Sequence, residues 1–232
     1  IGSAKDFHIF FKSFPNHKTF SYDILNFINK NKLSSSSAFS QWSVSFNQYI
    51  KKNHTNEKNI LVGYSLGGRL SLHALTHADH WNGAVIVSAN PGLIKEEEKK
   101  ARVQHDSTWS QKFLTKEWDA LMNEWENQTA FCGVANPLER SENDYNREDL
   151  AQIMNSFSLG QQNNLREEIK KINIPVLWLA GEYDKKYADL AQEIAELNKN
   201  ILVKIISRAG HRVPWENEED FVKAVNDFLG VF

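Results

Sequence analysis

The sequence has one cysteine, no long apolar run and no strong excess of either charge, and each of these features excludes a class of protein. The single cysteine among 232 residues, Cys132, cannot form an internal disulfide or build a cysteine metal site, which fits a reducing compartment. No apolar run approaches the roughly 20 residues that a membrane-spanning helix needs. The formal net charge of -2 offers no basic field for nucleic acid and no polybasic block for a membrane surface. We therefore expect a cytoplasmic protein that binds neither nucleic acid nor membrane.

The histidines are scattered, and only one local group has a spacing that suits metal ligands. His73, His77 and His80 lie close together, and the first two would share one face of a helix. No acidic residue stands between them as in the helical metalloprotease pattern. An ordinary, partly exposed helix face is the favoured interpretation, and we expect neither a metal ion nor another cofactor.

The chain is long enough for one domain with a full hydrophobic core and an insertion. Several apolar runs are nearly continuous, which is typical of parallel strands covered on both faces. Helical periodicity separates these runs, and the alternation predicts an α/β fold with a mostly parallel sheet flanked by helices. The expected strands are residues 19–25, 59–64, 83–89, 174–181 and 201–207, and the expected helices are 37–52, 66–78 and 216–229.

One long stretch interrupts this alternation. Residues 94–170 contain no convincing strand and are charged, aromatic and helix-prone. Long insertions in a rigid scaffold commonly serve as lids or binding surfaces. We interpret this stretch as an inserted helical cap, with residues 1–93 and 171–232 as the two parts of the core domain.

The segment LVGYSLGGRLSL places a serine between an apolar strand and a helical pattern. A Gly-x-Ser-x-Gly motif in that context predicts a nucleophile elbow, a strained turn that exposes the serine Oγ. We expect a Cβ atom at Gly63 or Gly67 to crowd the turn around Ser65. The backbone N–H of Leu66 would then donate to a developing oxyanion, aided by the positive end of the helix.

A serine hydroxyl needs a base, and the elbow fold supplies its partners in the order Ser, Asp or Glu, His. Asp184 follows the strand-like segment PVLWLAG, and His211 follows IIS. Both residues would lie at the carboxyl ends of parallel strands, where open α/β sheets place their sites. We assign Ser65, His211 and Asp184 as a triad, with Glu182 as the alternative acid. These features predict an α/β-hydrolase fold with a helical cap.

The second oxyanion donor of this fold normally lies in an early loop, often within a His-Gly motif. The sequence contains no such motif, and its first residues, IGSAKDFHIF, resemble the segment that follows it. We expect the first strands of the fold and the His-Gly pair to lie upstream of Ile1.

The motifs in order are VGYSLGGRLSLHAL, VSANPGL, ARVQHDSTW, WENQTAF, SLGQQNNL and LAGEYDKKY. Together they resemble, over nearly the whole chain, the 2-succinyl-6-hydroxy-2,4-cyclohexadiene-1-carboxylate synthases of menaquinone biosynthesis. The resemblance implies a lyase that eliminates pyruvate from an enolpyruvyl cyclohexene carrying a succinyl arm. It further implies that Ser65, activated by His211 and Asp184, acts as the base that removes a ring proton.

The same resemblance implies a small polycarboxylate substrate held by arginines, which bind carboxylates bidentately and stay charged when buried. Arg69 lies one helical turn beyond Ser65, and Arg102 lies in the cap. Arg140 matches a third family arginine less well, so Arg147 competes with it. The implied substrate-binding residues are Tyr64, Arg69, Arg102, Trp125 and Arg140, and Glu126 stands where the family typically has tyrosine.

Two other functions remain open on the sequence alone. The triad by itself fits a serine carboxylesterase or thioesterase that acts through an acyl-Ser65 intermediate. A non-catalytic interaction protein that keeps the fold is the third possibility. The sequence does not determine the oligomeric state, and we expect a monomer.

Overall fold

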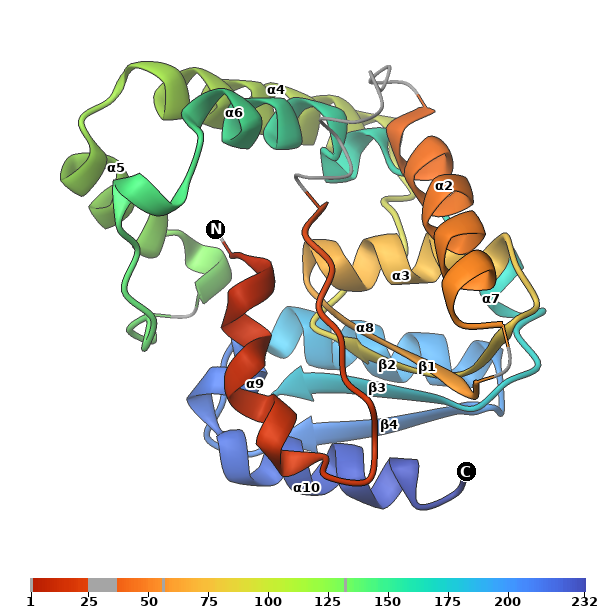
Figure 1. Cartoon of the computed structure of the whole chain (residues 1–232). Coiled ribbons are helices and arrows are strands. Elements are labelled where there is room, and N and C mark those ends of the chain that lie inside the picture. The colour runs from red at the N-terminus through yellow and green to blue at the C-terminus, as the bar shows by residue number, and fades with distance from the viewer. Residues whose placement is uncertain (1, 25–36, 56, 132) are drawn as a thin grey trace.

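The computed structural model describes residues 2–24, 37–55, 57–131 and 133–232, so Cys132 lies outside the described part. The described residues form an α/β structure with one four-stranded sheet in the order β1-β2-β3-β4, and all neighbouring strands are parallel. This architecture confirms the predicted fold class (Figure 1). The strands are β1 (Asn59–Tyr64), β2 (Trp81–Val87), β3 (Val176–Gly181) and β4 (Ile201–Ile206).

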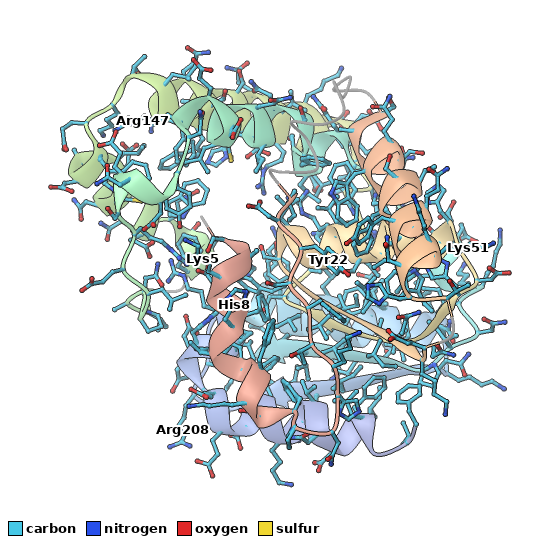
Figure 2. The ribbon with its side chains drawn as sticks, viewed as in Figure 1. Lys5, His8, Tyr22, Lys51, Arg147 and Arg208 are labelled. Carbon is cyan, nitrogen blue, oxygen red and sulfur yellow. The ribbon has the colours of Figure 1, made fainter. Side chains whose placement is uncertain are left out.

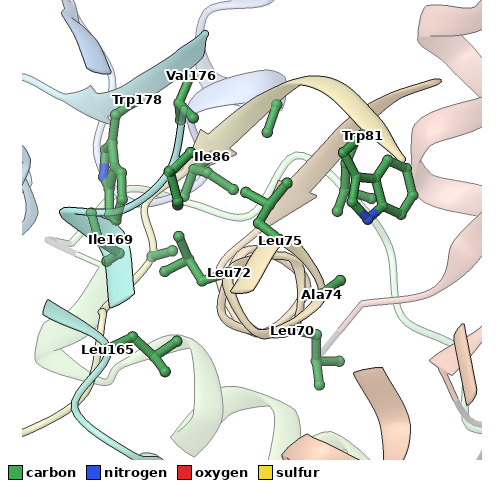
Figure 3. Packing of buried hydrophobic residues seen from close by; sticks show 14 of the residues in the cluster. Leu70, Leu72, Ala74, Leu75, Trp81, Ile86, Leu165, Ile169, Val176 and Trp178 are labelled. Carbon is green, nitrogen blue, oxygen red and sulfur yellow. The ribbon is translucent and has the colours of Figure 1, made fainter. Parts of the chain in front are cut away.

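Helices cover both faces of the sheet because the central strands are apolar on both sides. One buried cluster joins the sheet to α2 (Ala38–Asn53), α3 (Leu66–Thr76) and α8 (Lys185–Leu197), and Figure 3 shows part of its packing. A second cluster joins the other face to η1 (Ala4–Ser13), α9 (Val213–Glu216) and α10 (Glu218–Leu229). None of the described helices combines the length and apolarity needed to cross a membrane.

Between β2 and β3, the described residues form helices joined by loops and no strand. The helices are α4 (Glu96–Thr115), α5 (Trp118–Glu126), η3 (Thr129–Phe131), η4 (Glu142–Asp144), α6 (Arg147–Ser156), η5 (Leu159–Gln161) and α7 (Arg166–Ile169). Helices α4 and α6 lie side by side (Figure 1) and share an aromatic core that includes Trp109, Phe113 and Trp118. We call this segment the cap. The exact division of the chain into 1–93, 94–170 and 171–232 stays a prediction.

Four of the five predicted strands are confirmed, with ends that differ by up to two residues. The predicted strand at 19–25 is wrong over its described residues, which run irregularly to Ile24, and Leu25 lies outside the described part. The ring of Tyr22 packs against Phe46 and Tyr49 of α2, at centroid distances of 5.3 and 5.5 Å. A strand requires a hydrogen-bonded neighbour, and here a helix buries the apolar side chains instead. The expectation of further strands upstream of Ile1 stays a prediction.

The turn between β1 and α3 holds Ser65 at a φ of 49° and a ψ of -110°, in the left-handed region that non-glycine residues seldom occupy. The turn is held there by hydrogen bonds from Ser65 N to Val87 O at 2.8 Å and from Arg69 N to Ser65 O at 3.0 Å. The strand β1 and the helix α3 pack closely because Gly63 has no side chain. A Cβ atom at Gly63 would lie 2.3 Å from Ser71 Oγ and 2.5 Å from Gly67 O.

The expectation that Gly67 is also crowded was wrong, because a Cβ atom there would meet nothing within 4 Å. The second crowded position is Gly68, whose Cβ would lie 2.7 Å from the Ala89 Cβ. The motif spacing marks the turn correctly, but the helix rotates Gly67 away from the sheet and Gly68 toward it.

This difference predicts opposite effects of two neighbouring substitutions. Gly63→Ala should destabilise the fold by about 1–3 kcal/mol, the usual effect of overpacking. Gly67→Ala should leave stability unchanged or raise it, since alanine favours a helix over glycine by about 1 kcal/mol. Urea unfolding of both variants tests this, and equal midpoints for Gly63→Ala and the wild type would contradict it.

Candidate active site

Three residues from the ends of three parallel strands meet at one edge of the sheet. Ser65 follows β1, Asp184 follows β3 and His211 follows β4. The His211 Nε2 atom lies 3.1 Å from Ser65 Oγ, and the His211 Nδ1 atom lies 2.6 Å from Asp184 Oδ2. The carboxyl ends of parallel strands share one edge, so residues 146 positions apart in the chain become neighbours.

Burial determines the proton arrangement of this triad. Asp184 and His211 are each 4% exposed, so the carboxylate needs a donor and the imidazole supplies one. The Nδ1–H group donates to Asp184, which leaves Nε2 as the acceptor for the Ser65 hydroxyl. The ring of Tyr187 packs against the imidazole at a centroid distance of 4.7 Å. His211 is therefore oriented to take the serine proton.

Glu182, the alternative acid, has a different partner. Its carboxylate accepts the backbone N–H of Arg208 at 2.9 Å, on the exposed surface. Arg208 has a positive φ of 53°, and this contact supports the turn after β4. Glu182 therefore supports a turn, whereas Asp184, two residues later in the chain, orients the imidazole.

Tyr64 and Leu66 flank the serine on the strand and helix sides. Tyr64 is the last residue of β1, and its ring lies 5.6 Å from that of His211 and 5.0 Å from that of Trp215. Burial raises the pKa of the Tyr64 phenol, which keeps it protonated. Leu66 begins α3, where the first N–H groups lack partners within the helix. That position suits an oxyanion donor.

Arg69 lies in the first turns of α3 without an ion-pair partner among the described residues. Its Nη1 atom donates to Phe157 O at 2.9 Å and reaches Gln162 Oε1 at 3.5 Å. Its guanidinium lies 5.5 Å from the centre of the Phe39 ring. Burial, followed by the charge of Arg102, lowers the pKa of Arg69 to about 10, so it remains a cation at neutral pH.

Arg102 of α4 approaches the same place from the cap. Its Nε atom donates to both carboxylate oxygens of the buried Asp106 at 2.8 Å, one helical turn away. Its two terminal nitrogens make no hydrogen bond within the described chain. Burial raises the pKa of Tyr187, and the charges of Arg69 and Arg102 both oppose that rise.

Gln162 links three of the sequence motifs through hydrogen bonds. This buried side chain accepts from Arg69 and donates from Nε2 to Asn90 O at 3.0 Å. Asn90 Oδ1 in turn accepts the N–H of Gly92 at 2.9 Å. The segments VSANPGL and SLGQQNNL therefore hold the Arg69 guanidinium in place, a positioning role that motif order alone did not reveal.

The other two candidate arginines have carboxylate partners of their own. Arg140 pairs with Asp6 of η1, through Nη1 to Oδ1 at 2.9 Å and Nη2 to Oδ2 at 2.8 Å. Arg147 pairs with Glu142 and donates to the carbonyls of Phe113 and Lys116, within the cap (Figure 2). In the part of the chain that the structure describes, these contacts do not extend to the triad, and a substrate-binding role for Arg140 stays a prediction.

Trp125 lies in the cap core, at ring-centroid distances of 4.9 Å from Trp109 and 5.5 Å from Phe113. Its buried indole nitrogen has no hydrogen-bond partner among the described residues. The next residue, Glu126, forms an ion pair with the buried Arg212, directly after His211. Sequence reasoning missed this pair, although the replacement of tyrosine by Glu126 marked the position as unusual.

The histidine group at the end of α3 shows no metal site. His77 Nδ1 lies 2.6 Å from the His73 carbonyl oxygen, and the His73 ring stacks on Phe39 at 4.8 Å. Burial, followed by the neighbouring charges of His77 and Arg69, lowers the pKa of His73 to about 3. No cluster of three or more metal-ligating side chains occurs in residues 2–24, 37–55, 57–131 and 133–232.

Comparison with known proteins identifies the family to which this geometry belongs. The sequence pattern of the alpha/beta hydrolase fold family matches residues 1–218. The chain belongs to the alpha/beta hydrolase fold family. This α/β-hydrolase resembles the solved structure of MenH from S. aureus, with a TM-score of 0.83 and 22% identity over 98% of this chain and 89% of that one.

Curated relatives of the α/β-hydrolase confirm the resemblance that the motifs predicted. It is 31% identical over 179 residues to the 2-succinyl-6-hydroxy-2,4-cyclohexadiene-1-carboxylate synthase of Photorhabdus laumondii, over 74% of this chain and 62% of that protein. It is 26% identical over 182 residues to the synthase of the same name from Serratia proteamaculans, over 76% of this chain and 69% of that protein. The aligned part of the chain thus spans less than two thirds of the length of the Photorhabdus relative and slightly more than two thirds of the Serratia relative.

The pair of Asp6 and Arg140 predicts a pH-dependent contribution to stability. Burial alone would raise the pKa of Asp6, but hydrogen bonds from Arg140 and Ser3 hold it below its usual value. The stabilisation is therefore complete above the unfolded-state pKa of about 3.9 and is lost as the pH falls through the lower folded-state value. Asp6→Asn should lower the free energy of unfolding by about 1.5–3 kcal/mol near pH 7. The loss should become smaller as the pH falls through the folded-state pKa of Asp6, because the wild-type carboxyl group is then protonated as well.

The matched control is Glu142→Gln, which removes the exposed partner of Arg147 and should cost less than about 1 kcal/mol. Urea unfolding of both variants at several pH values checks the expectation. A cost for Asp6→Asn that does not change with pH would contradict it.

Proposed function

We propose that this α/β-hydrolase is a lyase of menaquinone biosynthesis. It would convert 2-succinyl-5-enolpyruvyl-6-hydroxy-3-cyclohexene-1-carboxylate into 2-succinyl-6-hydroxy-2,4-cyclohexadiene-1-carboxylate and pyruvate, the product named for its relatives. The observation that carries the proposal is a pair of cations, Arg69 one helical turn beyond Ser65 and Arg102 on the cap helix α4. Arg69 has no ion-pair partner within the described chain, and Arg102 has two terminal nitrogens without hydrogen bonds there.

The chemistry follows from the acidity of the substrate. The ring proton next to the succinyl ketone is the acidic one, because the ketone oxygen can accept the charge that develops. His211 takes the proton of Ser65 Oγ, and the serine oxygen removes that ring proton. The ring double bond then shifts, the carbon–oxygen bond to the enolpyruvyl group breaks, and the leaving enolate gains a proton to become pyruvate.

The surroundings of Ser65 suit this reaction. The N–H of Leu66 at the positive end of α3 would stabilise the oxyanion on the succinyl ketone. Arg69 and Arg102 would bind carboxylates of the substrate bidentately. Proton transfer and carbon–oxygen cleavage change no oxidation state of the enzyme, so the proposed reaction needs no cofactor. We place it in the cytoplasm, with the protein as a monomer.

The first prediction from this proposal concerns the serine. Incubation with the enolpyruvyl substrate should release pyruvate, and Ser65→Ala should lower the rate by at least about a hundredfold, because the oxygen that removes the ring proton is lost. Lactate dehydrogenase coupled to the release of pyruvate measures the rate. Release of pyruvate at the same rate by Ser65→Ala would contradict the proposal.

Activated neutral esters distinguish the proposed lyase from an esterase. The lyase should show no burst of alcohol and no acyl group on Ser65 when examined by mass spectrometry. A burst together with trapped acyl-Ser65, in the absence of pyruvate release from the enolpyruvyl substrate, would assign the protein to the esterases.

A second prediction concerns the cation on α3. Arg69→Ala should lower kcat/KM for the polycarboxylate substrate by more than about tenfold, since a charged hydrogen bond contributes about 1.5–3 kcal/mol. Arg69→Lys should recover part of the loss, because the charge returns without the bidentate geometry. Unchanged kcat/KM in Arg69→Ala would remove Arg69 from the binding site.

A further inference from the structure

The cap contacts the loop of the catalytic histidine through one buried guanidinium. Arg212 follows His211 directly and is 5% exposed. It forms an ion pair with Glu126, the last residue of α5, and donates from Nη1 to Val134 O at 3.3 Å. Its guanidinium also lies 3.7 Å from the centre of the Phe131 ring. All three partners belong to the cap segment formed by residues 126–131 and 133–136.

Physical chemistry makes this contact sensitive to its carboxylate. A buried guanidinium is costly to desolvate, and it is tolerated when a carboxylate and further acceptors surround it. Glu126 is itself fixed, because its second oxygen, Oε1, accepts Asn136 Nδ2 at 3.0 Å. Loss of the Glu126 charge would leave Arg212 buried without a counterion and favour its movement toward solvent.

Movement of Arg212 would reach the imidazole by two routes. The first is the backbone, because Arg212 and His211 are adjacent in the chain. The second is Phe131, whose ring centroid lies 6.2 Å from that of His211, so Phe131 contacts both residues of the loop. His211 must keep a single orientation to bridge Asp184 and Ser65 at 2.6 and 3.1 Å.

We propose that Glu126 and Arg212 are positioning residues that join the cap to the histidine loop, so that the cap and His211 hold their places as one unit. Neither residue is required to touch the substrate. The kinetic consequence rests on the proposed lyase function, whereas the mechanical coupling between cap and loop does not.

Amide hydrogen exchange tests the coupling without any substrate. Glu126→Gln keeps the size of the side chain and one of its two accepting oxygens but removes its charge. It should accelerate exchange by at least about tenfold in residues 207–213, a segment of the core far from Glu126 in sequence. The control is Glu124→Gln. Glu124 lies on the same helix, and within the described chain its carboxylate pairs with Lys112 and Lys116 of the cap. This variant should leave exchange in residues 207–213 unchanged.

The charge-reversed double variant separates pairing from simple damage. Arg212→Glu alone should accelerate exchange in both the cap segment and the histidine loop. The combination of Glu126→Arg with Arg212→Glu should recover part of the protection, which measures the coupling between the two sites. Equal exchange in the histidine loop of Glu126→Gln and Glu124→Gln would overturn the proposal, as would additive effects of the two reversals.

Steady-state kinetics gives the second readout. Glu126→Gln should lower kcat for pyruvate release by about tenfold, because a misplaced base slows the proton transfer. KM should change less than about threefold, because Arg69 and Arg102 keep their own partners. A change in KM alone would overturn the positioning role. If the wild type releases no pyruvate, the proposed function fails, and the exchange comparison still decides the coupling.

Discussion

The turn at Ser65 is the constraint on which the rest of the site depends. A serine at a φ of 49° exists only where the surrounding structure holds it. Here the strand β1 and the helix α3 are clamped together by contacts too close for a Cβ atom at Gly63 or Gly68. The strain points the Oγ atom out of the sheet edge, where the loops after β3 and β4 bring Asp184 and His211 to it. A relaxed turn would separate the three residues even if every strand remained.

The arginines of this chain differ in their ion-pair and hydrogen-bond partners. Arg140, Arg147 and Arg212 each pair with a carboxylate and join parts of the fold. Arg69 is held by carbonyl and amide oxygens, and Arg102 commits only one of its nitrogens to Asp106. Arg69 is thus a buried cation that has no carboxylate partner among the described residues, and an anionic substrate would supply its counterion. The proposed reaction rests on this distribution of charge and not on the triad alone.

Much of the fold could be predicted from residue patterns. The apolar runs of β1 to β4 and the spacing of Gly63, Ser65 and Gly67 reflect local physics, and they indicated the parallel sheet and the elbow. The order Ser65, Asp184, His211 then followed from the topology. The segment before Ile24 has the same apolar character, yet its partners lie on a helix. Local pattern cannot show whether a strand has a neighbour.

Pairing between distant side chains was beyond sequence reasoning for the same reason. Arg140 with Asp6 spans 134 positions, and Arg212 with Glu126 spans 86. The residues next to them in the sequence do not indicate their partners. From the sequence alone, a cap arginine that binds substrate therefore cannot be distinguished from one that anchors the cap. The sequence pattern also could not show that Gly68 packs closely and Gly67 does not, because the face that a helix turns inward depends on what the helix covers. The useful sequence signal was the departure at Glu126, where an acid replaces the expected aromatic residue.

The central claim is that Ser65 removes a proton from carbon and does not attack a carbonyl. The most direct measurement is the single-turnover rate with substrate carrying deuterium on the ring carbon next to the succinyl ketone, combined with mass analysis of Ser65 during the turnover. Proton abstraction by Ser65 predicts a slower rate with deuterium and no added mass on the serine. Equal rates for both substrates, together with an acyl group on Ser65, would contradict it.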